Sequence, residues 1–558
     1  MLRRLSRGSA LVTATAALLV LFVMGSGVLT LSAQSMRRSH FDAMRAQALT
    51  AAEAGAEKAL FYLRTTAPDG TVNGSWRTAS LTEQFAAGDY TITAQDGTGP
   101  NSGKVIVTST GRMRNGSNGT IRRTVRVVVK LTREDISVWN NAVFGGVGQS
   151  GRSIQGNVAI RGSMHLLGDG ESWSDLDGDQ HWDAGEAYTD SNGNGTYDAG
   201  EPYTDSDGDG HRDARETFND VNGNGTCDPP LTVTDLSTDV SGTATIGNNY
   251  DIMPSSLRSL IPNPPTANVN GESVETLNAK LRAKHGFVSI SGTATVGQPD
   301  VSGGSPPRKE TLDGTFVSDG FAGNSGSANV YSDNGTHMKY DLGEGLVAFP
   351  TLTEPTVKNG VSYSSYMSYL SASGLNISGS VTIQPGTSYG PLSDGKGNYL
   401  YVDASGNMVV RGIVYVNGDI NIKSTSGNKD MRYLGRGTLV STGSVYLGTN
   451  MIPSSASFPI NHALGVIARR ELKIATGGGD SQLQIAGAFY AQEKITSAKQ
   501  NELLGTFVSS YFAMDNVPHM YQIPSLPDNL PPGMPGSSRV WVKTVRIDSW
   551  REITNPTS

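Results

Sequence analysis

Residues 9–36 read SALVTATAALLVLFVMGSGVLTLSAQSM and contain no charged side chain. As a helix this run would be about 40 Å long and would exceed the roughly 30 Å hydrocarbon core of a bilayer. A secretory signal peptide would have a shorter apolar run with a small-residue cleavage site after it, whereas here Gly8 precedes the run. The run therefore predicts a membrane-spanning helix that stays in the mature protein.

The flanks of this run extend the helix but do not orient it. Arginines lie on both sides, in the leader MLRRLSRG and at Arg37, Arg38 and Arg45. We expect the short leader to stay inside and the long remainder to be exported. The Ala-rich stretch 46–63 continues the helix, and no proline occurs before Pro68. One helix over residues 9–64 is predicted, apolar in its first half and amphipathic in its second.

Two motifs give this N-terminus a family likeness. Arg7-Gly8-Ser9-Ala10-Leu11-Val12, with Ala51-Ala52-Glu53-Ala54-Gly55 about forty residues on, resembles the start of PilX-type type IV minor pilins. The resemblance implies cleavage by a prepilin peptidase after Gly8 and methylation of the new N-terminus at Ser9. Major pilins carry Glu at the fifth mature position, where this chain has Thr13, which indicates a tip, minor or accessory role. The alternative is a simple membrane anchor with an Ala-rich stalk.

Residues 65–134 alternate apolar and polar side chains with a period of two. The clearest runs are 88–94, 104–108 and 124–131, separated by Gly, Asn and Ser turns. They predict a small antiparallel sheet packed on the helix, an α+β arrangement like that of a pilin head.

The C-terminal half repeats a unit of two short strands marked by glycine. The units start at Gly412, Gly437, Gly465, Gly487 and Gly505, and earlier candidates lie at 153–160, 243–246, 288–290 and 375–383. Unequal loops between stacked units favour a β-solenoid, and the alternative is a β-sandwich or jelly roll. This half, with Leu530-Pro531-Pro532-Gly533 and Ser549-Trp550-Arg551-Glu552, is similar to the bactofilin-like β-helical region found behind PilX-type N-termini.

Composition agrees with a mainly β protein whose charge is uneven. The 68 Gly and 25 Pro argue against a helical protein, and 37 % hydrophobic residues argue against disorder. One cysteine, Cys227, excludes an internal disulfide and a Cys-cluster metal site. Residues 171–228 carry a net charge of −14 and the rest of the chain +7. The absence of a dense basic patch argues against nucleic acid as a partner.

The acidic segment contains four loops at a constant period of fifteen residues. Their first aspartates are Asp175, Asp190, Asp205 and Asp220, and the loops match the calcium pattern D-x-[DN]-x-[DN]-G-x₅-E. Calcium takes six to eight oxygens, which short side chains at positions 1, 3 and 5 and a long Glu at position 12 can supply. The predicted metal ligands are Asp175, Asp177, Asp179, Asp183, Glu186, Asp190, Asn192, Asn194, Asp198, Glu201, Asp205, Asp207, Asp209, Asp213, Glu216, Asp220, Asn222, Asn224 and Asp228.

The four loops differ in completeness, and we expect them to bind two to four Ca²⁺. The second and third have every element, the first has Gln180 in place of glycine, and the fourth ends in Leu231. Three residues between loops leave no room for the helices of EF-hands. An aromatic recurs at the same period (Trp173, Tyr188, Tyr203, Phe218), which predicts a stacked spine. The segment is similar to the tandem calcium-loop repeats of bacterial surface proteins, and the alternative is a solvated acidic linker.

No catalytic constellation is evident, and we expect no enzyme. The one GxSxG motif, Gly386–Gly390, lies between Pro385 and Pro391, which indicates a turn and not a nucleophile elbow. Cys227 is expected to be a packing residue. A β-helical glycan-active enzyme remains the less favoured alternative.

The predicted fold class is α+β, mainly β. The expected divisions are a leader (1–8), a transmembrane stem (9–64), a small β domain (65–134), first rungs (135–170), the calcium cassette (171–231), a solenoid-like head (232–524) and a tail (525–558).

The expected function is that of a minor-pilin-like structural or adhesive component of a type IV pilus, held in the inner membrane of a bacterial envelope and facing outward. The partners it implies are other pilin-like subunits, the pilus assembly machinery, a prepilin peptidase and a surface ligand. The alternative is a static membrane-anchored surface protein.

Overall fold

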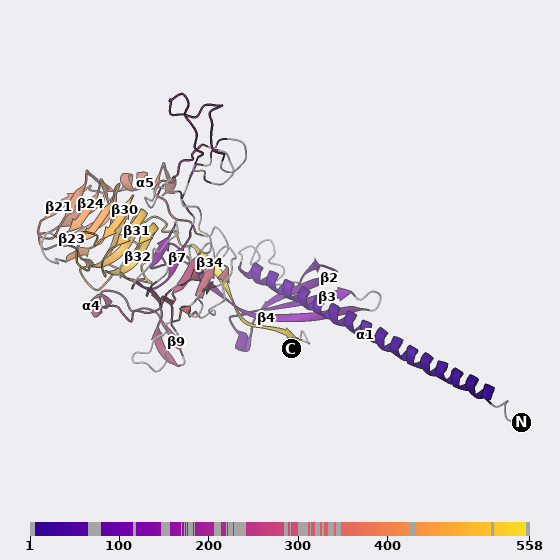
Figure 1. Ribbon diagram of the computed structural model, residues 1–558. Coiled ribbons are helices and arrows are strands. Elements are labelled where there is room, and N and C mark those ends of the chain that lie inside the picture. The colour runs from indigo at the N-terminus through magenta and orange to yellow at the C-terminus, as the bar shows by residue number, and fades with distance from the viewer. Residues whose placement is uncertain are drawn as a thin grey trace. The chain divides into compact units, whose positions relative to one another are not determined.

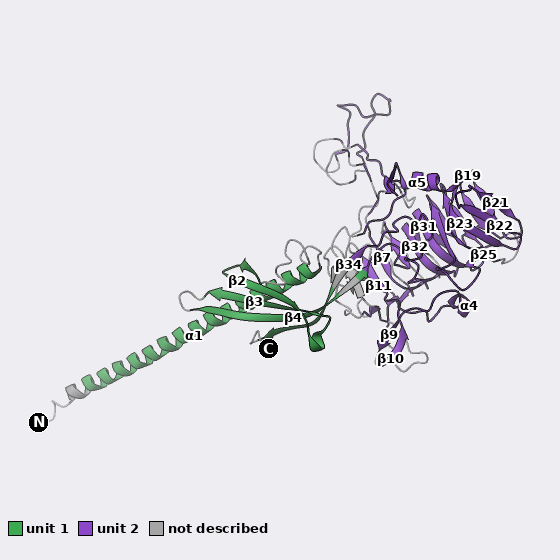
Figure 2. Ribbon diagram, turned by 180° about the vertical axis from the view of Figure 1, so that it is seen from behind, with its two compact units in different colours: residues 1–134, 542–558 green, residues 135–541 purple. Residues whose placement is uncertain are grey.

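The structure, a computed structural model, divides the chain into two compact units: unit 1 comprises 1–134 with 542–558, and unit 2 comprises 135–541 (Figure 2). The structure describes residues 6–64, 80–114, 119–146, 157–168, 242–269, 271–283, 288–290, 292–298, 311–312, 314–317, 324–325, 329–332, 340–341, 347–424, 430–514 and 518–553. Between 168 and 242 it describes 170, 171, 173, 174, 176, 182, 185–205, 212, 214–218, 220 and 227.

Helix α1 spans Ser6–Arg64 and confirms the single long helix that the sequence predicts (Figure 1). Gly8 and Ser9 lie in its first turns. Every side chain from residue 10 to residue 43 is exposed. Within α1, the segment Ala10–Leu63 is long and apolar enough to cross a membrane.

The second half of α1 packs on the sheet of unit 1 through small residues. Its buried face repeats every three or four residues, as a helix requires: Met44, Ala48, Ala51, Ala52, Ala56, Ala59, Leu60 and Leu63. Gly55 lies on this face, where an added Cβ would be 2.8 Å from Tyr90 Cδ2. The Ala51–Gly55 motif therefore has a physical reason, since only small side chains allow the helix so close to the sheet.

The sheet of unit 1 has five strands in the order β1-β2-β3-β4-β34. The three predicted runs are confirmed as β2 (Gly88–Asp96), β3 (Val105–Arg114) and β4 (Thr120–Asp135), and β1 (Leu81–Phe85) lies at one edge. The other edge is β34 (Trp541–Ile553), in the segment expected to be a tail. Arg123 pairs with Glu552 and the Ile136 amide with the Val540 carbonyl, so β34 runs antiparallel to β4.

Unit 2 is a stack of parallel β rungs, as expected of a solenoid. One column of aligned residues runs through nine successive rungs, and all of its members are buried: Leu375, Val414, Leu439, Val466, Phe489, Phe507, Val143, Met164 and Leu281. Phe489 and Phe507 stack within it, with ring centroids 4.7 Å apart. A rung buries its apolar side chains only against its neighbours, so the stack holds itself together.

The order of rungs in space differs from their order in sequence. From β5 (Val143–Gly145) the chain builds outward through β7 (Met164–Leu166), β11 (Lys280–Ala283) and β14 (Gly314–Val317). It then passes to β19 (Leu375–Ser378) at the opposite end. From there it returns through β23 (Asn407–Asn417), β26 (Arg436–Ser441), β29 (Ala463–Ala468), β31 (Gln484–Ser497) and β32 (Glu502–Ala513).

The returning rungs end against the first one. β32 pairs with β5, and β33 (His519–Tyr521) pairs with β6 (Ala159–Arg161). The chain therefore enters and leaves unit 2 in the middle of the stack.

The predicted rung starts align only in part. Gly412 stands opposite Gly437, and Gly487 opposite Gly505, but Gly465 stands opposite Thr438. At the end of the stack where β19 lies, β22 (Tyr399–Val402) pairs antiparallel with β23, and β21 (Tyr389–Ser393) pairs antiparallel with β22. β21 carries Pro391 and a register shift, both of which blunt an edge strand against further pairing.

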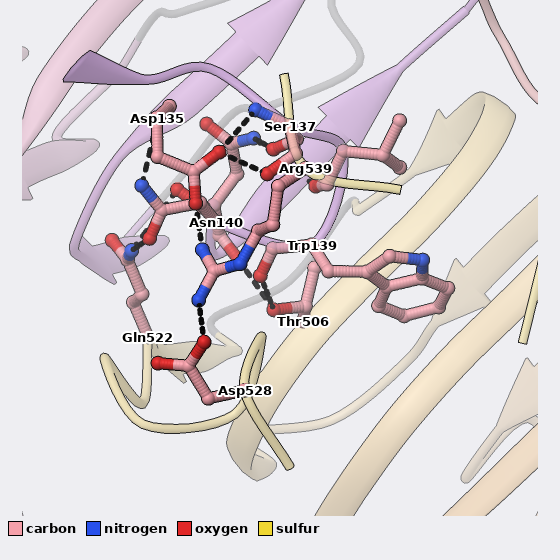
Figure 3. A network of polar contacts seen from close by, with 10 residues as sticks. Asp135, Ser137, Trp139, Asn140, Thr506, Gln522, Asp528 and Arg539 are labelled. Carbon is pink, nitrogen blue, oxygen red and sulfur yellow. Dashed lines mark hydrogen bonds and ion pairs between the residues drawn. The ribbon is translucent and has the colours of Figure 1, made fainter. Parts of the chain in front are cut away.

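A polar network joins the two ends of unit 2 (Figure 3). The Arg539 guanidinium pairs with Asp135 and with Asp528, and Asp135 Oδ1 accepts a 2.9 Å hydrogen bond from the Ser137 amide. Trp139 Nε1 donates to the Pro535 carbonyl at 2.7 Å. Residues near the start of the unit (Asp135, Trp139) are thus bonded to residues near its end (Pro535, Arg539).

Candidate metal-binding cassette

The four acidic loops, called the cassette below, lie between β7 (Met164–Leu166) and β8 (Thr245–Gly247). β7 pairs with β5 and β8 pairs with β6, so β7 and β8 belong to the same turn of the stack. The cassette is therefore inserted within one rung and not between two rungs.

The second loop, Asp190–Glu201, is described in full, and its first aspartate organises the turn. Asp190 Oδ2 accepts from the Gly195 amide at 2.7 Å, and Oδ1 accepts from the amides of Gly193 and Asn194 at 2.6 and 3.2 Å. The hydrogen bond from Gly195, followed by those from the other amides, lowers the pKa of Asp190. Gly195 has φ +77, so the glycine predicted for position 6 is required by the backbone.

The remaining predicted ligands of this loop gather round Asp198 and Glu201. The side-chain amides of Asn192 and Asn194 donate to Asp198 Oδ2 at 2.5 and 2.8 Å. Glu201 accepts from the Ser191 amide at 2.8 Å and from the Asp198 amide at 3.0 Å. The structure thus joins positions 1, 3, 5, 9 and 12 by hydrogen bonds within one loop.

The glutamates at position 12 share an unusual environment. Glu186, Glu201 and Glu216 are 7 %, 9 % and 2 % exposed, although glutamate is rarely buried without partners. The other described ligands are half-buried or exposed: Asp190, Asn192, Asn194, Asp198, Asp205 and Asp220. Among the described ligands, the buried carboxylates are therefore those at position 12.

The expected spine of four stacked aromatics is wrong. The backbone of Trp173 forms an isolated antiparallel β-bridge with that of Phe218, and Tyr188 forms one with Tyr203. The bridges are nested, with the second loop inside the inner pair. An outer and an inner pair meet across the cassette because the chain turns back at the second loop.

Ten predicted ligands fall outside the described residues: Asp175, Asp177, Asp179, Asp183, Asp207, Asp209, Asp213, Asn222, Asn224 and Asp228. Within the part of the chain that the structure describes, no group of three or more His, Cys, Asp or Glu side chains is placed to hold a metal ion. Cys227 is buried, as its expected packing role requires.

A charged cluster on the solenoid was not found from the sequence. Glu471 pairs with Lys473 at 2.7 Å and with Lys494 at 3.1 Å, on neighbouring rungs. Burial raises the pKa of Glu493, and the negative charge of nearby Glu471 raises it further. Rung register brings these residues together, and the spacing of one sequence does not reveal it.

Ser388 of the GxSxG motif is followed by strand β21 and not by a helix, so it forms no nucleophile elbow.

No protein-family model matches the chain, and no curated protein matches it. Among solved structures, the chain is similar to the competence-associated pilin ComZ from Thermus thermophilus, with 16 % identity and a TM-score of 0.39. The match covers 91 % of this chain and 97 % of that chain.

Proposed function

We propose that this chain is a minor-pilin-like subunit of a type IV pilus or a related envelope filament, processed after Gly8 and methylated at Ser9. The observation that carries the proposal is the division of α1. Residues 10–36 carry no charge and the side chains of residues 10–43 are exposed, while the face from Met44 to Leu63 is buried against an antiparallel sheet. One helix can then serve as a membrane span before assembly and as a stem within a filament.

Thr13 defines the kind of subunit proposed. Its hydroxyl donates to the Ala10 carbonyl at 3.2 Å and brings no negative charge to the start of the stem. A charge-based docking contact at the fifth mature residue is then absent. This fits a tip or accessory position, with unit 2 as the outward structural or adhesive part.

Replacement of Gly8 tests this function against a static membrane anchor. We expect Gly8→Val to prevent removal of the leader and to keep the protein out of sheared filaments, measured by the mass of the mature N-terminus in a host that makes pili. Gly25→Val is the matched control, because a Cβ added at Gly25 meets no atom of the described residues within 4 Å. Equal processing and location of both variants would favour the static anchor.

We further propose that the cassette binds Ca²⁺ and is stiffened by it. All side-chain donors at positions 1, 3, 5, 9 and 12 are oxygens, the set that calcium prefers. Three buried glutamates at position 12 support the assignment, since a buried carboxylate needs a compensating charge or donors. Bound ions would also relieve the repulsion within a segment of net charge −14.

Calorimetric titration of the full chain with Ca²⁺ tests this second proposal. We expect Glu201→Gln to weaken or remove one binding event, because it removes the long carboxylate of the second loop. Ser191→Ala, which changes an exposed side chain of the same loop, should leave the titration unchanged. No heat from the unaltered chain at millimolar Ca²⁺ would refute calcium binding.

A further inference from the structure

The second loop shows how a loop of the cassette closes on itself. Just outside its ends, the Thr189 amide donates to the Pro202 carbonyl at 2.8 Å. Inside, the Ser191 amide at position 2 donates to Glu201 at position 12. The ring of Tyr197, at position 8, packs edge-on against Tyr203 beyond the loop, with centroids 6.0 Å apart.

The same three contacts recur between the first and third loops. The Ser174 amide donates to the Thr217 carbonyl at 2.8 Å, and the Leu176 amide, at position 2 of the first loop, donates to Glu216 of the third. Trp182, at position 8 of the first loop, packs edge-on against Phe218 beyond the third, at 5.3 Å. The start of the first loop is therefore closed by the end of the third.

The reverse contact is also present. Arg212, at position 8 of the third loop, lies over the ring of Tyr188 beyond the first loop, with Cζ 4.6 Å from the centroid, and also over Tyr197 of the second loop at 4.8 Å. In the second loop the residue at position 8 likewise packs on the aromatic that follows its own glutamate. The Thr204 amide, just before the third loop, donates to the Ala187 carbonyl just after the first at 2.8 Å, so the start of the third loop faces the end of the first.

The two segments cross at position 11. A Cβ on Gly185 of the first loop would lie 2.6 Å from the backbone nitrogen of Arg215, the same position in the third. Gly185 has φ +75, and so both its conformation and its neighbour require glycine. Gly200 of the second loop has φ +104, but among the described residues no atom lies within 4 Å of an added Cβ.

From these contacts we infer that the first and third loops exchange their C-terminal ends, so that Glu216 serves the first loop and Glu186 the third, while the second loop is self-contained. This inference rests on the proposed calcium function for its consequence, which is that an ion in either of the two exchanged loops takes its position-12 carboxylate from the other loop. Its geometric part is independent of metal.

Cysteine pairs in the full chain with Cys227→Ala test the geometry. Thr217 Oγ1 lies 3.2 Å from Ser174 Oγ, so Ser174→Cys with Thr217→Cys should form a disulfide under mild oxidation. Ser174→Cys with Thr189→Cys is the matched control, because a sequential spine would bring these two equivalent positions together. A link in the control pair and none in the first pair would overturn the inference.

Gly185→Ala and Gly200→Ala separate the exchange from simple backbone strain. Both replace a glycine of positive φ at position 11, but only Gly185 faces another segment. We expect Gly185→Ala alone to lower the yield of the 174–217 disulfide. Equal yields in both variants would contradict a crossing at Gly185.

Terbium luminescence tests which glutamate serves which loop. Tb³⁺ is an oxygen-seeking ion close in size to Ca²⁺, and excitation of Trp182 sensitises an ion held in the first loop. We expect Glu216→Gln to abolish this signal and Glu186→Gln to retain it, although Glu186 belongs to the first loop by sequence. The opposite result would overturn the exchange. If the unaltered chain gives no terbium luminescence, metal binding is refuted. The disulfide experiment then still tests the exchange.

Discussion

At the scale of single residues, one ionic cluster fastens α1 to the first hairpin of unit 1. Glu83 on β1 accepts from Lys58 Nζ and from the Tyr90 hydroxyl, each at 2.5 Å. The hydrogen bond to Lys58, followed by that to Tyr90, lowers the pKa of Glu83. The bond to Glu83 raises the pKa of Lys58, and burial raises that of Tyr90 to about 12.

These shifts predict how the stability of unit 1 depends on pH. The depressed pKa of Glu83 gives stability that is present above about pH 4.5 and is lost as pH falls through the folded value. The raised values of Lys58 and Tyr90 give stability that is present below about pH 10 and is lost above it.

Glu83→Gln should reduce the acid-side loss by at most about 1 kcal/mol, because the cluster is about one third exposed. The measurement is hydrogen exchange of β1 and β2 between pH 3 and 8. Glu53→Gln, at an exposed position of the same helix, should leave the profile unchanged.

At the scale of elements, the network of Figure 3 predicts an asymmetry between two carboxylates that share Arg539. The side chain of Asp135 is 6 % exposed and that of Asp528 73 %. Loss of the buried partner leaves a half-buried guanidinium undercompensated, so Asp135→Asn should destabilise unit 2 by about 2 kcal/mol. Asp528→Asn should cost under about 0.5 kcal/mol. Denaturant unfolding followed by tryptophan fluorescence, to which the buried Trp139 contributes, compares the two variants, and equal losses would refute the role of burial.

Elements were predictable from sequence where local pattern decides them. The apolar run and the Ala-rich stretch predicted α1, and period-two alternation predicted β2, β3 and β4. The period of fifteen identified the loop positions at which the structure buries Glu186, Glu201 and Glu216. The pairing of the loops was not predictable, because all of them carry the same residue types and any two could exchange ends. The nested bridges arise only once the chain turns back at the second loop.

At the scale of the whole molecule, unit 2 is an insertion between two neighbouring strands of one sheet. β4 ends at Asp135 and β34 begins at Trp541, and the two run antiparallel. Replacement of residues 136–540 by a short Asn-Gly turn should therefore close an ordinary hairpin. We expect the shortened chain to fold with α1 and all five strands intact, measured by circular dichroism and hydrogen exchange in detergent. Loss of protection in β2 and β3 would show that unit 1 depends on unit 2.

The order of the rungs could not be predicted from the sequence, for a related physical reason. Parallel pairing is set by side chains that match across rungs, and Val143 finds its partner in Phe507, far along the chain. The local sequence of neither strand indicates that contact. The same holds for β34, whose sequence is strand-like but whose partner is β4.

The seam between β32–β33 and β5–β6 has a consequence for biogenesis. A chain synthesised from its N-terminus contains β4, β5 and β6 early, yet each of the three pairs with a strand encoded after residue 501. A polypeptide cut short anywhere before that point keeps open edges in both units at once, and open edges invite aggregation and proteolysis. Synthesis of the last fifty or so residues is thus what supplies the missing neighbours of β4, β5 and β6.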